Sequence, residues 1–438
     1  MSKKILVIVC IAFILLGTSC SLLNREKNEL TREDEWQGII TIWDFPRWAD
    51  EKGNKFYWLQ QNIEEFEREN PGVFIELRRL DWENGAFEVN SALLSNTYPD
   101  IVPNVVDYEH VLKGHVEPID KFLTKEDYKD FYQISLDSVT FDGHIWGFPM
   151  FITTYAMFIN LDIFNERDIE PPEAGIWTWD EFVDKLVKLT YKMGSNDTNE
   201  LEIYGFHTFI KEGYYEPWGF LTSDGGTIFN DDLTEFTLCS PEGISGLTKL
   251  ADINRKYKVT PPEFGDDDPY EAWSKFAEKQ KVAVFPAGSW AVKVLNDKKK
   301  NGEGFNFDVA GYPIGDLGTQ SIVCSGVGGY MILKQDNDVK KKLCADFLKK
   351  ITSAEEQMEL EHYGVFPSRK SAGNLYIDNP HMTKINEMLG FMMPIPNHPL
   401  WDKIEPLLQS EIKDAVKGEK TPFDALNDAK REIELLLD

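Results

Sequence analysis

Aromatic and acidic side chains follow each of the first three apolar runs that read as strands. The three pairs are Trp43-Asp44, Trp82-Glu83 and Asp107-Tyr108. Ligands of open α/β sheets gather beyond the carboxyl ends of the strands, so geometry alone makes these pairs candidates for a binding site. A ring can cover an apolar surface, and a carboxylate can accept hydrogen bonds from hydroxyl groups. Core packing is the alternative for the tryptophans, and helix capping is the alternative for Asp107.

The motifs of the common hydrolytic and phosphate chemistries are absent from the sequence. It has no His-Glu-x-x-His pair for zinc, no Gly-x-Ser-x-Gly elbow, no phosphate loop and no Cys-x-x-Cys motif. With 74 acidic residues, some carboxylates lie close together by chance, so a glycosidase would need measured separations. The sequence therefore gives no reason to expect a cofactor or a metal. An extracellular polysaccharide-processing enzyme remains the alternative to a binding protein.

The charge and the cysteines limit the partners further. The formal net charge is -28, whereas nucleic acid and anionic lipid are bound through clustered Lys and Arg, so neither is expected as a partner. Beyond residue 20 the cysteines are Cys239, Cys324 and Cys344, and an odd number does not predict a disulfide framework. No function is assigned to these three thiols.

The N-terminus has the order of a secretory signal. Lys3 and Lys4 precede an apolar run over residues 5–16, which is shorter than the roughly 20 residues of a spanning helix. Small residues then lead to Cys20, and this order resembles a bacterial lipoprotein signal, although Gly17 stands where that family usually has Leu. The resemblance implies removal of residues 1–19, a lipid on Cys20 and a flexible tether over residues 20–35. Ordinary secretion and an uncleaved signal anchor are the alternatives, and each places the body of the protein outside the membrane.

Length and local patterns predict an α/β protein with two lobes. The chain has 438 residues, and single cores stop growing near ~250–300 residues. Alternation and helical spacing over residues 41–77 predict a strand, a helix and a second strand, which is the opening of a parallel sheet. Asp142-Gly143 predicts a tight hairpin, and Thr178 with Glu181 forms a capping box at a helix start.

Other helix ends are marked in the same way. Asp268-Pro269 and Thr421-Pro422 predict helix starts, Gly288-Ser289-Trp290 opens another helix, and Gly418 predicts a helix end. The last helix is expected to bury a stripe of apolar side chains. Its members are Phe423, Leu426, Ala429, Ile433 and Leu436.

Six segments between residues 98 and 370 resemble the extracellular solute-binding proteins of carbohydrate ABC transporters, the maltose- and oligosaccharide-binding type. They are Tyr98-Pro99-Asp100-Ile101-Val102, Asp142-Gly143-x3-Gly147-Phe148-Pro149, Phe158-Ile159-Asn160-x-Asp162-x-Phe164, Thr178-Trp179-Asp180-Glu181-Phe182, Phe276-Ala277-x5-Ala283-Val284-x3-Gly288-Ser289-Trp290 and Gly364-x2-Pro367-Ser368-Arg369-Lys370. Each segment alone has low specificity, but all six stand in the family's order.

The resemblance implies a two-lobed, periplasmic-binding-protein-like fold. Each lobe is expected to be a mainly parallel sheet flanked by helices, with a hinge between the lobes. The N-terminal lobe would hold residues 36–150 and 311–333, and the C-terminal lobe would hold residues 151–310 and 334–438. The chain would first cross near residues 153–155 and cross again near residues 309–310.

The implied function is transport. The protein would capture a mono- or oligosaccharide outside the membrane and deliver it, chemically unchanged, to an ABC permease by hinge closure. It would act as a monomer that touches the membrane only through its lipid. A sugar-sensing module that docks on a receptor is an alternative with the same fold.

A sugar has C–H bonds on its faces and hydroxyl groups at its edge, so flat rings and bidentate side chains are the expected contacts. The candidates are Trp43, Asp44, Trp82, Glu83, Asp107, Tyr155, Trp218, Trp290, Gly328 and Arg369. Trp290 leads this set, because the family stacks an aromatic ring on the sugar from the matching position. A bulge is the alternative for Gly328, and a solvated charge is the alternative for Arg369.

Overall fold

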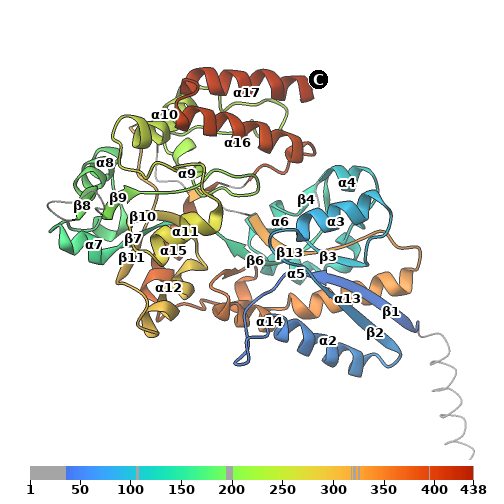
Figure 1. Ribbon diagram of the computed structural model, residues 1–438. Helices are drawn as coiled ribbons and strands as arrows, with labels where there is room; N and C mark the ends of the chain where they lie inside the picture. The colour runs from blue at the N-terminus through green and yellow to red at the C-terminus, as the bar shows by residue number, and fades with distance from the viewer. Residues whose placement is uncertain are drawn as a thin grey trace, which may run out of the picture.

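The computed structural model describes residues 36–104, 108–193, 201–316, 318, 322–323, 326–393 and 395–437. It has two lobes, each built around a central sheet with helices packed against it (Figure 1). Residues 1–35, with Cys20, lie outside the described part, as do Asp107 and Cys324. No helix within the described ranges has the length and apolar content needed to cross a bilayer.

The first lobe contains a six-stranded sheet with the order β14-β6-β13-β3-β1-β2. Its strands are β1 (Gly38–Asp44), β2 (Val73–Arg79), β3 (Ile101–Pro103), β6 (Phe148–Thr153), β13 (Gly326–Ile332) and β14 (Phe366–Pro367). The predicted β-α-β opening is present, because β1 pairs in parallel with both β2 and β3. The other described pairings are antiparallel: β13 with β3 and with β6, and β14 with β6.

The second lobe contains a five-stranded sheet with the order β11-β7-β10-β9-β8. Its strands are β7 (Tyr155–Asn160), β8 (Tyr191–Met193), β9 (Leu201–Phe206), β10 (Val282–Gly288) and β11 (Phe307–Ala310). Among its described pairings only β10 with β9 is parallel. Both sheets are therefore mixed rather than mainly parallel as predicted. Parallel neighbouring strands must be joined by a long crossover connection. Strand β7 instead enters its sheet directly from β6 of the other lobe, and it pairs antiparallel with β10 and β11.

One extended segment joins the two sheets at the predicted first crossing. Strand β6 belongs to the first sheet and β7 to the second, and only the buried Thr154 separates them. The chain returns to the first sheet between the end of β11 at Ala310 and the start of β13 at Gly326. Within this return segment, β12 (Ile322–Val323) pairs in parallel with β15 (Met392–Met393).

The C-terminal third is shared between the lobes, so the predicted placement of all of residues 334–438 in the second lobe is wrong. Helix α13 (Asp338–Ile351) buries Phe347 and Leu348 in the core that also holds Ile40 and Ile42 of β1. Helices α16 (Trp401–Lys417) and α17 (Pro422–Leu437) do pack on the second-lobe core. The apolar periodicity of α13 shows that one face is buried, but it does not show which sheet covers that face.

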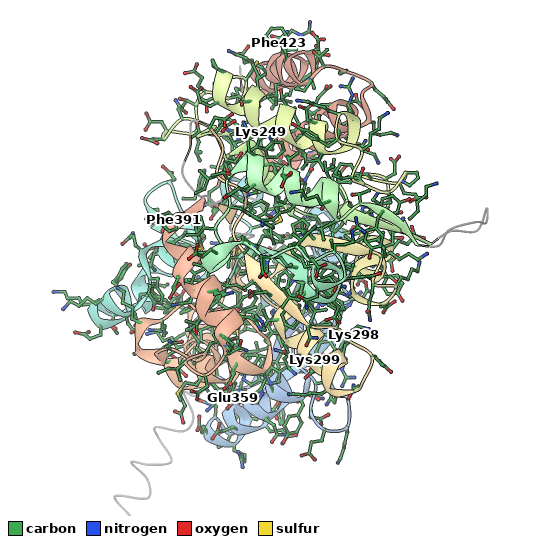
Figure 2. The ribbon with its side chains drawn as sticks, turned by 90° about the vertical axis from the view of Figure 1, so that its left-hand side faces the viewer. Lys249, Lys298, Lys299, Glu359, Phe391 and Phe423 are labelled. Carbon is green, nitrogen blue, oxygen red and sulfur yellow. The ribbon has the colours of Figure 1, made fainter. Side chains whose placement is uncertain are left out.

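Local signals placed the predicted turns and helix ends correctly. Strands β4 (Thr140–Phe141) and β5 (His144–Ile145) form the hairpin, with Asp142 and Gly143 both at positive φ. The capping box of α8 (Trp179–Lys188), the Asp268 cap of α11 (Pro269–Ala277) and the left-handed Gly418 are all present. One prediction for the last helix is wrong. Phe423 was expected in the buried stripe of α17, but it is 56% exposed (Figure 2).

The remaining helices cover the sheets and their connections. They are α2 (Tyr57–Glu69), α3 (Gly85–Leu94), α4 (Tyr108–Leu112), α5 (Lys125–Asp130), α6 (Gln133–Asp137), α7 (Leu161–Glu166), α9 (Trp218–Leu221), α10 (Pro241–Arg255), α12 (Ala291–Lys300), α14 (Ala354–Met358) and α15 (Pro380–Met388).

Candidate ligand-binding site

A buried ion pair lies at the end of β1, where the sequence predicted a ligand contact. Arg47 Nη2 lies 2.6 Å from Asp44 Oδ1, and Arg47 Nε donates to Oδ2 at 3.3 Å. The hydroxyl of Tyr330 also donates to Asp44 Oδ2, at 3.0 Å. Burial raises the pKa of Asp44, and the charge of Arg47 opposes that rise. Both oxygens of Asp44 are therefore engaged within the protein, so this carboxylate positions Arg47.

Aromatic rings surround Arg47 on the first-lobe side. Its guanidinium lies 5.4 Å from the ring centroid of Phe151 and 5.6 Å from that of Tyr330. The Tyr363 ring packs edge-on against Phe151 at 5.7 Å, and Trp48 lies 6.0 Å from Tyr363. The sequence analysis missed Arg47, Trp48 and Tyr363. The available signal was weak, because Arg47 and Trp48 lie three and four residues beyond the predicted pair.

Trp290 brings the second lobe to these rings. It caps α12, is 36% exposed, and its ring packs at 5.1 Å on Trp273. A Cβ atom on Gly364, next to Tyr363, would meet the Cα atom of Trp290 at 3.1 Å. Ser289 fixes this approach, because its Oγ donates to the Gly364 carbonyl at 2.8 Å. Its N–H donates to the Thr154 carbonyl at 2.9 Å.

Glu216 is a buried acid in the second lobe that the sequence analysis missed. It is 5% exposed, and within the described part of the chain its Oε2 atom has no hydrogen-bond partner. Burial raises its pKa to about 8, although the N–H groups of Glu216 and Tyr215 partly oppose this. A glutamic acid that stays protonated at neutral pH can donate one hydrogen bond and accept others. Such a group suits a hydroxyl-rich ligand.

Tyrosine and tryptophan side chains enclose Glu216. The hydroxyl of Tyr312 donates to the Glu216 carbonyl, and the charge of Glu216 adds to burial in raising the pKa of both Tyr155 and Tyr312. Trp218, two residues further on, is fully buried, and its Nε1 atom has no hydrogen-bond partner among the described residues. Tyr155 of β7 pairs with Gly288, two residues before Trp290, so Tyr155 links this group to the strand that leads to Trp290.

The pH dependence of stability tests the state of Glu216. Its folded-state pKa of about 8 exceeds the 4.5 of an exposed glutamate, so between these pH values only the folded chain holds the proton. Wild-type stability therefore falls as pH rises through this window, by up to about 1.4 kcal/mol per pH unit. In Glu216→Gln this decrease of stability with pH should disappear. Urea unfolding of both proteins between pH 4.5 and 8 measures the free energy of unfolding that decides this. Parallel stability curves for the two proteins would show that Glu216 is already ionised.

The predicted residues near β1 and β2 lie in different surroundings. Trp43 is half-buried, with the Arg78 guanidinium 4.2 Å from its ring centroid. Trp82 is 56% exposed and stacks on Phe45 at 4.3 Å with the rings nearly parallel. Glu83 is exposed next to it. Trp82 and Glu83 are thus open to a ligand, whereas Trp43 is partly covered by Arg78.

Gly328 and Arg369 both have structural roles. The role of Gly328 was given as an alternative in the sequence analysis, and that of Arg369 was not foreseen. The Phe151 ring occupies the space that a Cβ atom on Gly328 would need, and the strand register shifts directly after this residue. The Arg369 guanidinium is buried, with Asp127 at 3.0 Å and Asp130 at 3.2 Å. Arg369 therefore fastens α5 to the segment after β14, and its charge is not solvated.

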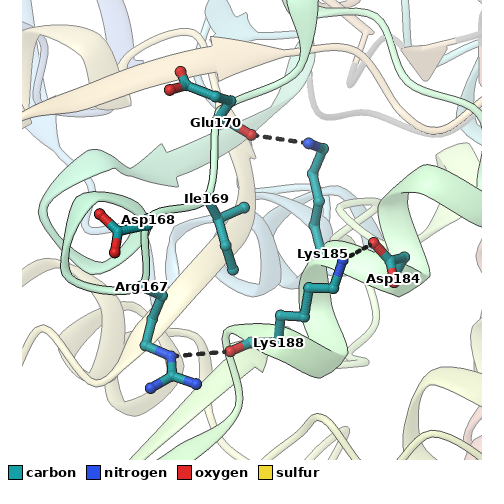
Figure 3. Close-up of a pocket in the computed structure, with 7 residues that line it drawn as sticks. All are labelled: Arg167, Asp168, Ile169, Glu170, Asp184, Lys185 and Lys188. Atoms are coloured by element: carbon teal, nitrogen blue, oxygen red, sulfur yellow. Dashed lines mark hydrogen bonds and ion pairs between the residues drawn. The ribbon is translucent and has the colours of Figure 1, made fainter.

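A surface pocket lies on the second lobe at α7 and α8 (Figure 3). It encloses about 330 Å³ and is lined by Arg167, Asp168, Ile169, Glu170, Asp184, Lys185 and Lys188. Lys185 donates to the Glu170 carbonyl at 2.9 Å, and Lys188 pairs with Asp184 at 2.5 Å. None of the rings around Arg47 or Glu216 lines this pocket, so it is separate from the candidate site.

The site therefore combines rings and hydrogen-bonding groups from both lobes. Trp48, Phe151 and Tyr363 surround Arg47 in the first lobe, and Trp290 adjoins them from the second. Within the described ranges, no group of three or more His, Cys, Asp and Glu side chains could hold a metal ion. The arrangement favours a neutral ligand with apolar faces and polar edges.

Comparisons with solved structures agree with this fold. An ABC substrate-binding protein of Listeria monocytogenes in complex with cycloalternan superposes with a TM-score of 0.75, at 21% identity over 92% of this chain and 99% of that one. The maltotriose-binding protein of Thermus thermophilus gives 0.72, at 22% identity over 91% and 100% of the two chains. These similarities establish the fold.

Sequence comparison places the chain in a family. A binding protein of Brucella abortus is 23% identical over 85% of this chain and 88% of its own length. Residues 49–358, more than half of the chain, match the family described as bacterial extracellular solute-binding protein. The chain therefore belongs to the family of bacterial extracellular solute-binding proteins.

Proposed function

We propose that the protein captures a mono- or oligosaccharide outside the membrane and delivers it to the permease of an ABC transporter. The observation that carries this proposal is the family match together with the site at the lobe boundary. Exposed Trp290 supplies a flat ring, and protonated Glu216 supplies a donor and an acceptor in a buried setting. Structural neighbours hold cycloalternan and maltotriose, which have the same combination of apolar faces and hydroxyl edges.

Closure of the two lobes about the β6–β7 segment would couple capture to delivery. Arg47 and Tyr363 belong to the first-lobe core region, and Glu216 and Trp290 belong to the second lobe. A ligand that touches both sets gains all its contacts only when the lobes are shut. Its differential affinity then shifts the population toward the closed form, which the permease recognises.

The proposed contacts extend the predicted set. We retain Trp82, Glu83, Tyr155, Trp218 and Trp290 as ligand contacts and add Arg47 and Glu216. Asp44 holds Arg47 in place through their ion pair. A ligand contact at Asp107 stays a prediction. We infer that the ligand leaves unaltered and that the protein acts as a monomer. The family match supports neither a polysaccharide-processing enzyme nor a sensing module.

The family is extracellular, so the protein acts outside the cytoplasm. We infer that a lipid on Cys20 holds it at the membrane through the tether of residues 20–35. The sequence Gly17-Thr18-Ser19-Cys20 supports this inference. Mass spectrometry of the N-terminal peptide of the mature protein tests this inference. A peptide that begins at Cys20 with the mass of an attached lipid would support it, and an unmodified first residue would favour ordinary secretion.

A melting scan over mono- and oligosaccharides tests the substrate class. A ligand at ~100 times its dissociation constant adds roughly 2.7 kcal/mol to the free energy of unfolding, so the right sugar should raise the melting temperature. Peptides and polyamines serve as controls of similar size. A rise with these compounds and none with any sugar would overturn the substrate class, while products of bond cleavage would overturn the binding function.

A further inference from the structure

The loop over residues 211–218, which carries Glu216 and Trp218, is held by one helix. Gln409 of α16 donates from Nε2 to the carbonyl of Tyr214 at 2.7 Å and to that of Lys211 at 3.2 Å. Glu405, one turn earlier, accepts from the Gly213 N–H at 2.8 Å. The two side chains are also joined to each other at 3.0 Å. Three backbone groups of the loop therefore depend on two buried side chains.

A third residue of the same helix continues this contact. Trp401 Nε1 donates to the Tyr215 hydroxyl at 3.1 Å, and the Trp401 ring packs edge-on against Trp218 at 5.9 Å. Residues four apart lie on one face of a helix, so Trp401, Glu405 and Gln409 form a single ridge. This ridge faces the loop, while Ile404, Leu408 and Ile412 anchor α16 in the second-lobe core.

The segment before this helix, and its first turn, contact the other lobe. Asn397 Nδ2 donates to the carbonyl of Asp137 in α6 at 2.8 Å, and Lys403 Nζ lies 3.9 Å from Glu109 in α4. Helices α4 and α6 belong to the first lobe through their buried residues Val111 and Leu136. The region of the helix that contacts the loop is therefore also joined to the first lobe, by one hydrogen bond and one ion pair.

We propose that Glu405 and Gln409 are positioning residues that hold the loop over residues 211–218 in its binding shape, and that the Asn397 contact links this shape to lobe closure. The inference rests on the proposed function, since it concerns how the same site is set. Gln409 directs its donor Nε2 to two carbonyls of the loop, and Oε1 of Glu405 accepts from the Gly213 N–H, so both side chains act on the loop backbone. Their effect on the ligand passes through Glu216.

Gln409→Met tests this role, because methionine keeps the length of the side chain and removes its donors. The freed loop should let water reach the Glu216 carboxyl, and sugar affinity should fall roughly tenfold. The pH midpoint of sugar binding should move down from about 8 toward 4.5. The titratable groups facing Glu216 are Tyr155, Tyr214, Tyr215 and Tyr312, and burial keeps the pKa values of Tyr155, Tyr214 and Tyr312 above this range.

Glu411→Gln is the matched control on the same helix. Glu411 pairs with Lys420 at 2.7 Å and does not touch the loop, so this variant should lose stability and keep the binding midpoint. If Gln409→Met binds sugar more weakly but keeps the pH midpoint of the wild type, the inference is overturned. It is also overturned if Gln409→Met binds sugar as tightly as the wild type does. If Gln409→Met does not fold, Glu405→Met removes the Gly213 contact and carries the same expectation.

A second readout works without any sugar. The carboxyl carbon of Glu216, followed by NMR in the ligand-free protein, should titrate near 8 in the wild type and lower in Gln409→Met. If no sugar binds even the wild type, the proposed function fails while this titration still decides the positioning role. Equal midpoints in the two ligand-free proteins would overturn the inference alone.

Discussion

Replacing Trp290 with alanine should remove most of the thermal stabilisation that a saturating sugar gives. The Trp290 ring packs on Trp273, the residue is 36% exposed, and its backbone lies against Gly364, the neighbour of Tyr363. Truncating a tryptophan at the centre of a binding site costs about 2 kcal/mol or more, which is roughly 30-fold in affinity. At a sugar concentration of ~100 times the original dissociation constant, the stabilisation then falls from roughly 2.7 to below about 1 kcal/mol.

Two further variants make this result specific. Phe423→Ala removes another exposed ring, on α17 far from the lobe boundary, and should leave the stabilisation by sugar unchanged. Trp290→Phe keeps a flat ring and should retain part of the effect. If Trp290→Ala responds to sugar like the wild type, then Trp290 does not belong to the site.

Arg47→Met should lower the free energy of unfolding by about 3–5 kcal/mol at neutral pH. Methionine fills a similar volume, so the main loss is the charge that compensates the fully buried Asp44. Removing one partner of a buried pair leaves the other charge without compensation, which is the most costly outcome for such a pair. Urea unfolding of the variant and the wild type measures this difference.

The pH dependence identifies the cause of that loss. Burial already raises the pKa of Asp44, and without Arg47 nothing of similar strength opposes the rise. Protonation then removes the buried charge, so the deficit of the variant should shrink as pH falls through the raised pKa. Lys188→Met, which breaks the exposed pair with Asp184, should leave stability nearly unchanged. A deficit that is the same at all pH values would point to packing rather than charge.

Local chemistry made much of the fold predictable from the sequence. The hairpin at Asp142-Gly143 and the capping box of Thr178 with Glu181 depend only on neighbouring residues, and both are present. Strand direction depends on distant pairings such as Gly326 with Thr153, which no local pattern encodes. The lobe assignment of α13 failed for the same reason.

The site was less predictable, because its polar residues are of types that are usually exposed. Arg47 gave only a weak signal in the sequence and Glu216 gave none, since charged residues are almost never fully buried unless paired. The pairing of Arg369 could not be predicted because its partners, Asp127 and Asp130, lie far back in the chain. Trp290 was predicted from its resemblance to a position where the family stacks a ring on the sugar, and the structure places it at the start of α12.

The hydrogen bond from the Ser289 N–H to the Thr154 carbonyl ties Trp290 to the segment between the two sheets. Rotation about that segment should alter the surroundings of Trp290, whose backbone lies against Gly364 of the opposite lobe. The protein therefore contains its own fluorophore where the lobes meet. The chain has 12 tryptophans, so the difference in emission between the wild type and Trp290→Phe should report whether the lobes are open or shut, without an added label.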